Sequence, residues 1–366
     1  MSIINLYEKS DKLFFVGGVV RDELLGEKSF DVDLTYVGNA IEFVKSLDFC
    51  KIKQVNEEFG SVHVEIDDKT IDITSTRTES YPQKGGLPLV NKIGCDLRED
   101  VLRRDFTVNA IAKNCKTGEI VDYVGGLEDL KNKKLRVLYD ESFIDDPTRI
   151  VRGLKFSVRF GFELEEKTRK LQDEYLSNIN YTMSYKRLKD ELMDAFNINK
   201  EEVLEKFVNQ GIYKLLSLNE YVSYICNVEE FIKPYLNEID NIWLIYFCGF
   251  DLNNLALTKA EGRILDGYKK LYKINLVKDI DIYNAFKNVD IESVLMYGIT
   301  KNREVVKRYL DKLRDIKLSI RGRDLIELGY SPSAKISECL NHVMQVKIDN
   351  PDISYEEEIA IAKKFM

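Results

Sequence analysis

The stretch LFFVGGVVRDELLGEKSFDVDLTYV, residues 13–37, decides the fold of the N-terminal part of this chain. Its two apolar ends are typical of strands, and between them the pattern predicts a glycine turn and a short helix over residues 19–25, closed by Gly26. Because glycine has no Cβ atom, the backbone N–H groups at Gly17 and Gly18 can approach an anion closely. A Gly-Gly pair alone is more often a tight turn than a phosphate site, so the residues that follow decide its meaning.

An arginine and two aspartates follow this turn. Arg21 lies one turn into the expected helix, where it can reach the same anion. Asp31 and Asp33 alternate with apolar residues, so on a strand both carboxylates project from one face. Two such acids can share divalent cations, and a third from a neighbouring strand would complete a two-metal site for phosphoryl or nucleotidyl transfer. Asp72, in the alternating run TIDITS (70–75), is the candidate third acid. An isolated D-x-D is typically a solvated strand edge, but the glycine turn upstream favours metal ligands.

The segment RRDFTVNA, residues 103–110, places basic and acidic residues before an apolar run. Arg104 can hold a phosphate or a ribose, and Asp105 can orient an arginine or accept a hydrogen bond from a ribose hydroxyl. The alternative is a capped helix start, with Asp105 or Thr107 as the cap. Both interpretations can hold together.

The segment DDPTRIVRGLKFSVRFGF, residues 145–162, predicts a helix that begins near Pro147 and carries a basic stripe. The stripe consists of Arg149, Arg152, Lys155 and Arg159. A basic stripe is usually a solvated helix face. Here Asp146 precedes Arg149 by three residues, so an acceptor and a planar donor can point into the same space. Such a pair can read the edge of a nucleotide base, because the carboxylate accepts from an amino group while the guanidinium donates to a ring nitrogen.

Composition describes an ordinary globular protein. The 366 residues are 44% hydrophobic and 32% charged, and no apolar run is long enough to cross a membrane. The opening MSIINLYEKSDK does not resemble a signal peptide, so we expect a cytoplasmic protein. The six cysteines never form a CxxC pair, which favours reduced, buried thiols, and two histidines exclude histidine-rich metal chemistry. A net charge of −8 argues against indiscriminate coating of nucleic acid, although residues 149–189 carry ten basic and five acidic side chains.

The predicted secondary structure changes along the chain. Residues before about 140 mix short strands with turns, whereas later residues read as successive helices. The sequence therefore predicts an α+β protein with a catalytic α/β head over residues 1–140 and a helical neck carrying the basic stripe over 141–200. An all-α body and tail would span 201–366.

Taken in this order, the four motifs resemble the class II tRNA nucleotidyltransferases, a bacterial CCA-adding family that also includes bacterial poly(A) polymerases. The resemblance covers residues 13 to about 192, and more loosely the tail segment IRGRDLIELGYSPSAKISECL. It implies a nucleotidyltransferase head with a small β-sheet. By this resemblance, Asp31 and Asp33 would bind two Mg²⁺ ions and activate the 3′-hydroxyl of an RNA for attack on the α-phosphate of CTP or ATP. Asp72 would be the supporting third carboxylate.

The resemblance also assigns the nucleotide-binding positions. Gly18 of the glycine turn (Gly17, Gly18) and Arg21 would hold the triphosphate, Arg104 the sugar-phosphate, and Asp146 with Arg149 the base. Arg152 and Lys155 fall on two further basic positions, the second of which is often arginine in the family. The stretch VDYVGGLEDLKNKKLRVL (121–138) matches the hinge between head and neck, and SYKRLKDELM (184–193) the neck helix that steadies the base-reading helix.

The implied function is metal-dependent, template-independent addition of C, A or both to the 3′ end of tRNA, with release of pyrophosphate. The implied partners are the acceptor arm and 3′ end of tRNA together with CTP and ATP, and no membrane or protein partner is indicated. The segment at 80–99 corresponds to the flexible loop that helps to decide between CC, A and CCA addition in the family, and this sequence leaves that choice open. A poly(A) polymerase of the same family and a catalytically silent RNA-binding protein are the alternatives.

Overall fold

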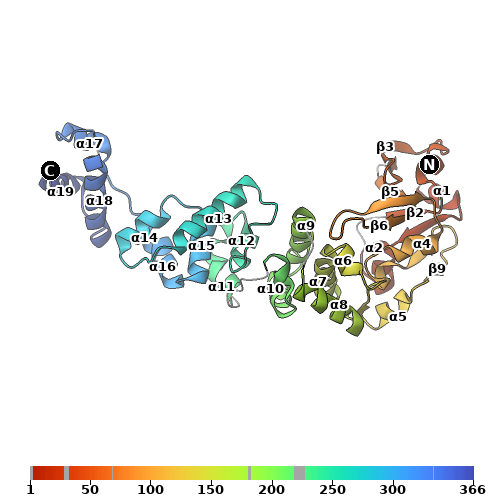
Figure 1. Ribbon diagram of the computed structural model, residues 1–366. Coiled ribbons are helices and arrows are strands. Elements are labelled where there is room, and N and C mark those ends of the chain that lie inside the picture. Colours follow the sequence, from red (N-terminus) through yellow and green to blue (C-terminus); the bar gives the residue numbers. More distant parts are fainter. Residues whose placement is uncertain (1–2, 29–32, 68, 180–182, 218–226, 333) are drawn as a thin grey trace. The chain divides into compact units, whose positions relative to one another are not determined.

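The structure of the protein is a computed structural model that describes residues 3–28, 33–67, 69–179, 183–217, 227–332 and 334–366 (Figure 1). Contacts divide the chain into two compact units, Met1–Asn219 with Asn254–Ala256, and Glu220–Asn253 with Leu257–Met366. The expected head and neck thus fall within the first unit, and the boundary between them at residue 140 stays a prediction.

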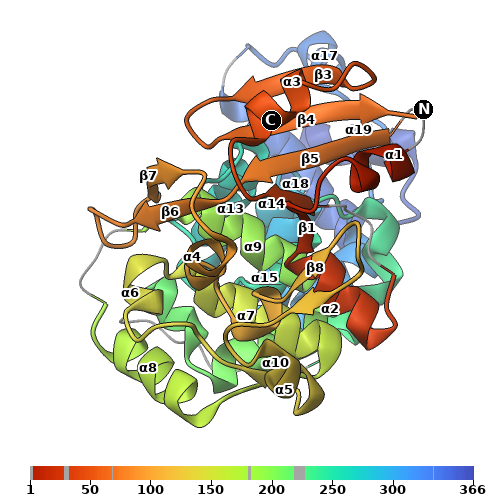
Figure 2. The same cartoon turned by 90° about the vertical axis from the view of Figure 1, so that its right-hand side faces the viewer.

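A seven-stranded sheet is the framework of the first unit, with the strand order β3-β4-β5-β2-β1-β8-β9. β2 and β5 pair in parallel, and the other neighbours in this sheet are antiparallel. Figure 2 shows the long strands β3, β4 and β5 side by side. The strands are β1 (Leu13–Val16), β2 (Asp33–Tyr36), β3 (Lys51–Asn56), β4 (Ser61–Ile66), β5 (Lys69–Ser75), β8 (Ala112–Asn114) and β9 (Ile120–Val121).

The two faces of this sheet have different roles because successive side chains alternate between them. Val62, Val64 and Ile66 of β4 are buried in the core, together with Leu34 of β2 and Ile73 of β5. Helix α3 (Ala40–Lys45) packs against β4 and β5, and its Ala40, Ile41 and Val44 belong to the same core cluster. The polar residues that alternate with these positions take the opposite face.

Short helices and two small strand pairs complete the first unit. Helix α2 (Gly18–Leu25) follows β1 and ends at Gly26, whose φ of +73° suits glycine, so the predicted short helix is confirmed. The other helices are α1 (Ile3–Glu8), α4 (Leu97–Leu102), η1 (Thr107–Asn109), α5 (Gly126–Lys131), α6 (Ser142–Asp145), α7 (Thr148–Phe160), α8 (Glu166–Ser177), α9 (Tyr185–Phe196), α10 (Lys200–Asn209) and η2 (Ile212–Leu215). The small pairs are β6 (Arg77–Ser80) with β7 (Leu89–Ile93), and β10 (Lys134–Leu135) with β11 (Glu163–Leu164).

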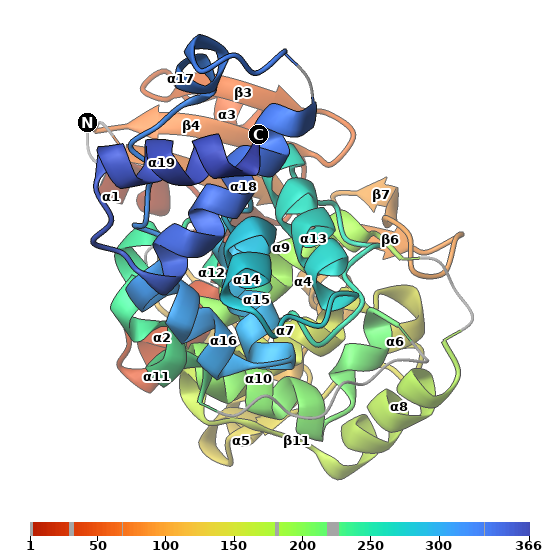
Figure 3. The same cartoon turned by 90° about the vertical axis from the view of Figure 1, so that its left-hand side faces the viewer.

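Over its described residues, the second unit is helical (Figure 3). Figure 3 also shows α18 and α19 of the tail crossing each other, and these helices share a small apolar core with Ile320, Leu325 and Tyr330. The helices are α11 (Val228–Ile232), η3 (Lys233–Glu238), α12 (Ile242–Tyr246), α13 (Lys259–Tyr272), α14 (Asp279–Phe286), α15 (Ile291–Thr300), α16 (Arg303–Arg308), η4 (Tyr309–Leu313), α17 (Gly322–Glu327), α18 (Ala334–Asp349) and α19 (Tyr355–Phe365). The predicted α+β class, with a sheet-containing head and a helical remainder, is confirmed.

Two further expectations concern helix length and cysteine chemistry. No helix within the described ranges is long and apolar enough to span a membrane. The cysteines at 50, 95, 115, 248 and 339 are free thiols; three are buried and two are half-buried. Burial raises the pKa of the Cys248 thiol to about 12, so this side chain is an inert core residue.

Candidate active site

One cavity of about 560 Å³ in the first unit gathers the segments that the sequence singles out. Residues from the glycine turn, the start of β2, the segment after α4 and helix α7 line it, and α9 contributes from the neck. The cavity is strongly charged, with nine cationic and six acidic residues in its lining, so it carries excess positive charge within an acidic chain. The residues predicted for the site that line it are Gly17, Gly18, Arg21, Asp33, Arg104, Asp105, Asp146, Arg149, Arg152 and Lys155.

The glycine turn opens the cavity at the start of α2. Gly17 has a φ of +74°, and a Cβ atom there would lie 3.2 Å from Nη1 of Arg104. Gly17 is also the N-cap of α2 and supplies no side chain to the first turn, which leaves backbone N–H groups open to an anion. Nη2 of Arg104 donates to Asp100 at 3.0 Å, and this fixes the guanidinium beside the turn. Glycine turn and Arg104 together therefore make a cradle for a phosphate.

Arg21 is buried among protein groups, whereas its position one turn into the helix suggests a side chain directed at an anion. It is only 3% exposed, and its Nε and Nη2 donate to Oδ1 of Asp22 at 2.8 and 2.6 Å while Nη1 donates to Asn109. The guanidinium also lies 4.8 Å from the ring centre of Phe156 and 4.7 Å from that of Phe160. Arg21 therefore ties α2 to η1 and α7, and its proposed contact with the triphosphate stays a prediction.

Two of the three predicted catalytic carboxylates are neighbours across the sheet. Asp33 of β2 pairs directly with Asp72 of the parallel strand β5, so both project from the face opposite the core. Asp33 lines the cavity, whereas Asp72 is not part of the lining and has a side chain that is 47% exposed. Nδ1 of His63 on β4 contacts Oδ1 of Asp72. Asp31 lies outside the described residues, and no group of three metal-ligating side chains is already assembled among those that are described.

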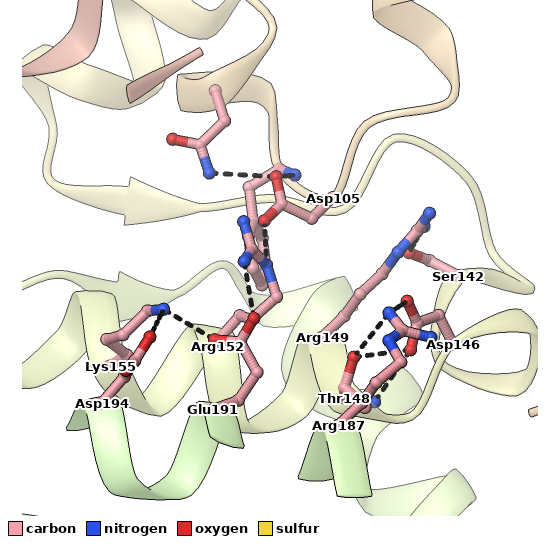
Figure 4. A network of polar contacts seen from close by, with 12 residues as sticks. Asp105, Ser142, Asp146, Thr148, Arg149, Arg152, Lys155, Arg187, Glu191 and Asp194 are labelled. Atoms are coloured by element: carbon pink, nitrogen blue, oxygen red, sulfur yellow. Dashed lines mark hydrogen bonds and ion pairs between the residues drawn. The ribbon is translucent and has the colours of Figure 1, made fainter. Parts of the chain in front are cut away.

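A chain of ion pairs links the base of the cavity to the neck (Figure 4). Nε of Arg152 donates to Asp105 at 2.8 Å, and its Nη1 donates to Glu191 of α9, also at 2.8 Å. Lys155 donates to the other oxygen of Glu191 at 2.6 Å and to Asp194 at 3.2 Å. Burial alone would raise the pKa of Asp105, but Arg152 and Asn109 outweigh it and lower that pKa to about 2. Asp105 is therefore a fixed negative charge at neutral pH.

Asp146 lies where α6 meets α7 and is 5% exposed. Its Oδ1 accepts hydrogen bonds from the backbone N–H of Thr148 at 3.2 Å and from the Thr148 hydroxyl at 2.6 Å. These bonds tie the carboxylate to the first residue of α7, although the N-cap position of that helix is Pro147. Its Oδ2 accepts from Nη2 of Arg187 at 2.6 Å, so a cation from α9 holds this carboxylate in place (Figure 4).

Arg149 is 4% exposed and is held from several sides. Its Nη1 donates to the hydroxyls of Ser142 at 2.6 Å and Tyr139 at 3.1 Å. Its Nη2 donates to the carbonyl oxygen of Arg103 at 3.0 Å and to the Tyr81 hydroxyl at 3.3 Å. The β6–β7 hairpin, which contains Tyr81 in its loop, thus reaches the residue that the sequence assigns to base reading.

Several cavity residues are not predicted by sequence patterns. Arg187 and Glu191 lie four apart on α9 and face α7 together, but a charged pair at this spacing usually describes a solvated helix face. Tyr81 and Arg103 lie within segments that the sequence singles out, but neither is named there as a site residue; both line the cavity and contact Arg149 of α7. The i to i+4 spacing on α9 is the one signal that could have identified any of them.

Comparisons with known proteins agree on one family. Residues 13–136 match the family model described as the Poly A polymerase head domain. The A-adding tRNA nucleotidyltransferase of Aquifex aeolicus (strain VF5) is 32% identical over 84% of this chain, and this chain spans 41% of that protein's length. The A-adding tRNA nucleotidyltransferase of Halalkalibacterium halodurans is 30% identical, over 90% of this chain and 82% of that protein. The CCA-adding enzyme of Bacillus pumilus is 28% identical, over 94% and 91%.

Solved structures give the same result. The structure of a CCA-adding enzyme in complex with CTP superposes with a TM-score of 0.74 and 27% identity, covering 99% of this chain and 93% of that one. The Thermotoga maritima CCA-adding enzyme in complex with tRNA superposes with a TM-score of 0.70 and 25% identity, covering 99% and 94%. The similarity therefore extends through the head and the helical remainder alike.

Proposed function

This chain belongs to the family of tRNA nucleotidyltransferases that carry the Poly A polymerase head domain, and from that premise we propose that it adds C, A or both to the 3′ end of tRNA. The observation that carries the proposal is the cavity of about 560 Å³, in which a glycine turn, a strand aspartate and a set of arginines meet. A nucleoside triphosphate needs these groups together: donors for its phosphates, a carboxylate near the α-phosphate and a polar pair for its base.

The nucleotide would lie along the cavity. The glycine turn and Arg104 would receive the triphosphate, because they offer open backbone N–H groups and a guanidinium fixed by Asp100. Arg152 and Lys155 would contribute positive charge from α7, although both already pair with acids of the neck. Asp146 and Arg149 would meet the base, where the carboxylate accepts from an amino group and the guanidinium donates to a ring nitrogen.

The carboxylates of the sheet suit a hard divalent cation. Asp33 and Asp72 are paired across β2 and β5 and supply only oxygen ligands, which Mg²⁺ prefers. With Asp31, they would hold Mg²⁺, which when bound neutralises phosphate charge and acidifies an attacking hydroxyl. The protein's own contribution is positional: Asp33 enters the cavity next to the glycine turn, so the 3′-hydroxyl of the RNA and the nucleotide would be brought to one place.

The helical second unit supports an RNA substrate. A cavity of about 860 Å³ there is lined by one face of α13 and by residues 285 and 287–290. Lys259, Lys270 and Lys287 are exposed in its lining, whereas Arg263 already pairs with Asp290 at 2.8 Å. Exposed lysines along a groove suit the phosphates of a double-stranded acceptor arm, which proteins recognise by shape and charge.

The experiment is single-nucleotide extension of three tRNA substrates that end before CC, after CC and after CCA, with Mg²⁺ and CTP, ATP or both. Stopping after CC, adding only the final A, or completing CCA would assign the specificity. Long A tracts would identify a poly(A) polymerase instead. No incorporation of any nucleotide would leave an RNA-binding protein without activity.

Asp33→Asn tests the catalytic assignment directly. We expect it to reduce incorporation by at least about 10³-fold while tRNA binding, measured by filter retention, changes little, because the carboxylate acts on the reacting groups and the helices hold most of the RNA. Asp48→Asn is the matched control, since Asp48 is exposed in the same unit and does not line the cavity. Normal turnover by Asp33→Asn would remove this residue from the mechanism.

A further inference from the structure

Three adjacent strands place an imidazole next to the two described carboxylates. His63 of β4 pairs with Asp72 of β5, and Asp72 pairs on its other side with Asp33 of β2. Residues paired directly across strands project to the same face, with Cβ atoms about 5 Å apart. Asp72 therefore stands in a row between His63 and Asp33, on the face of the sheet that the apolar core does not use.

The two oxygens of Asp72 have unequal surroundings. Oδ1 is buried, and His63 Nδ1 is the polar atom that lies against it; no other hydrogen-bond donor reaches Oδ1 from the residues that the structure describes. Yet 47% of the Asp72 side chain is exposed, so the open side of the carboxylate is the side away from His63. The imidazole side chain is itself 37% exposed and can supply an N–H group at Nδ1.

A contact of this kind matters for a metal ligand. An aspartate on an exposed strand face rotates about two side-chain bonds, and a cation site needs it in one orientation. A hydrogen-bond donor on one oxygen fixes the ligand and leaves the other oxygen free. Loss of such an outer partner typically costs about 10- to 100-fold in metal affinity.

We propose that His63 is a positioning residue of the cation site: it holds Oδ1 of Asp72 and thereby directs the open oxygen towards Asp33. The inference rests on the proposed function, since it takes Asp33 and Asp72 as the residues that hold the cation. Because His63 acts through Asp72, its loss leaves the nucleotide cradle of the glycine turn and Arg104 intact.

The test compares three proteins: wild type, His63→Leu and His63→Asn. Leucine removes the donor, while the side-chain amide of asparagine places an N–H group close to the position of Nδ1. The probe is Mn²⁺ alone, titrated into the full chain at one fixed pH and followed by electron paramagnetic resonance, with no nucleotide present. We expect His63→Leu to weaken Mn²⁺ binding about 10- to 100-fold and His63→Asn to restore it to within about threefold of wild type.

A second readout separates positioning from a general structural role. His63→Leu should raise the Mg²⁺ concentration for half-maximal incorporation by a similar factor while KM for CTP or ATP stays within about twofold of wild type. His342→Leu is the matched control, because this second histidine belongs to the second unit, where it stacks on Phe365 of the tail.

Two results would overturn the inference. Unchanged Mn²⁺ binding in His63→Leu, with binding lost in Asp33→Asn, would show that Asp72 needs no partner and would leave the proposed function intact. Absence of Mn²⁺ binding in the wild type would overturn the cation site of Asp33 and Asp72 and with it this inference, whereas the proposed function is decided separately by tRNA extension.

Discussion

Gly126 is the residue at which a single methyl group should disturb the site most. It begins α5 in the segment expected to be the hinge, and a Cβ atom added there would lie 2.3 Å from the carbonyl oxygen of Thr107 and 2.8 Å from Cγ1 of Ile111. Real Cβ atoms essentially never approach closer than 3.0 Å, so α5 must move by about 0.7 Å relative to η1. Gly126→Ala is therefore an overpacking substitution against rigid backbone.

The cost follows from what that movement breaks. Overpacking of this kind costs about 1–3 kcal/mol. The hydroxyl of Thr107 donates to Asp129 of α5 at 2.7 Å, and a shift of this size would stretch the bond out of range, which adds about 1 kcal/mol. The gain in helix propensity from alanine is at most about 1 kcal/mol. We expect a net loss of about 2–3 kcal/mol in the free energy of unfolding of the first unit.

The assay is urea unfolding followed by circular dichroism. Gly262→Ala is the control, because a Cβ atom at this position in α13 would meet nothing within 4 Å, so it should raise stability by up to about 1 kcal/mol. Nucleotide binding should weaken in Gly126→Ala as well, since η1 carries Asn109, which lines the cavity. A free energy of unfolding within about 0.5 kcal/mol of wild type would refute the reasoning, because the contact with Thr107 would then have relaxed without cost.

Two further predictions concern the charged network. Asp105→Asn should be less stable than wild type by about 2 kcal/mol at neutral pH, since Arg152 and Asn109 lower the pKa of Asp105 from 3.8 to about 2. Because its pKa is depressed, the ionised Asp105 carboxylate stabilises the fold above pH 4, and this stabilisation is lost as the pH falls through about 2. The urea midpoints of Asp105→Asn and wild type should therefore converge between pH 4 and 2. A constant difference between the midpoints would contradict the role of Asp105 as a fixed negative charge. Arg187→Met should weaken binding of CTP and ATP about tenfold or more in calorimetry, because buried Asp146 loses its cation at 2.6 Å. Lys186→Met, exposed on the same helix, should bind as wild type does, and equal affinities in both variants would mean that Arg187 does not support the base site.

Local patterns account for what the sequence could predict. The glycine turn, the short α2 closed by Gly26 and the alternation of residues 70–75 depend on residues a few positions apart, and the structure has them as expected. The order of the four motifs carried the family resemblance, which assigned roles to the site residues. Ten of the residues that the sequence names for the site line a single cavity.

Long-range pairing decided the rest. Asp33 meets Asp72 only because β2 pairs with β5 in parallel, a register that neither strand encodes alone. Arg187 meets Asp146 across 41 residues, and Arg21 links α2 to η1 and α7 because Asp22, Asn109 and two phenylalanines surround it. The sequence by itself determined which chemical groups the site can use, since turns, caps and alternation are local. Which of these groups face one another was decided only by the tertiary structure, because strand register and helix packing depend on contacts between distant segments.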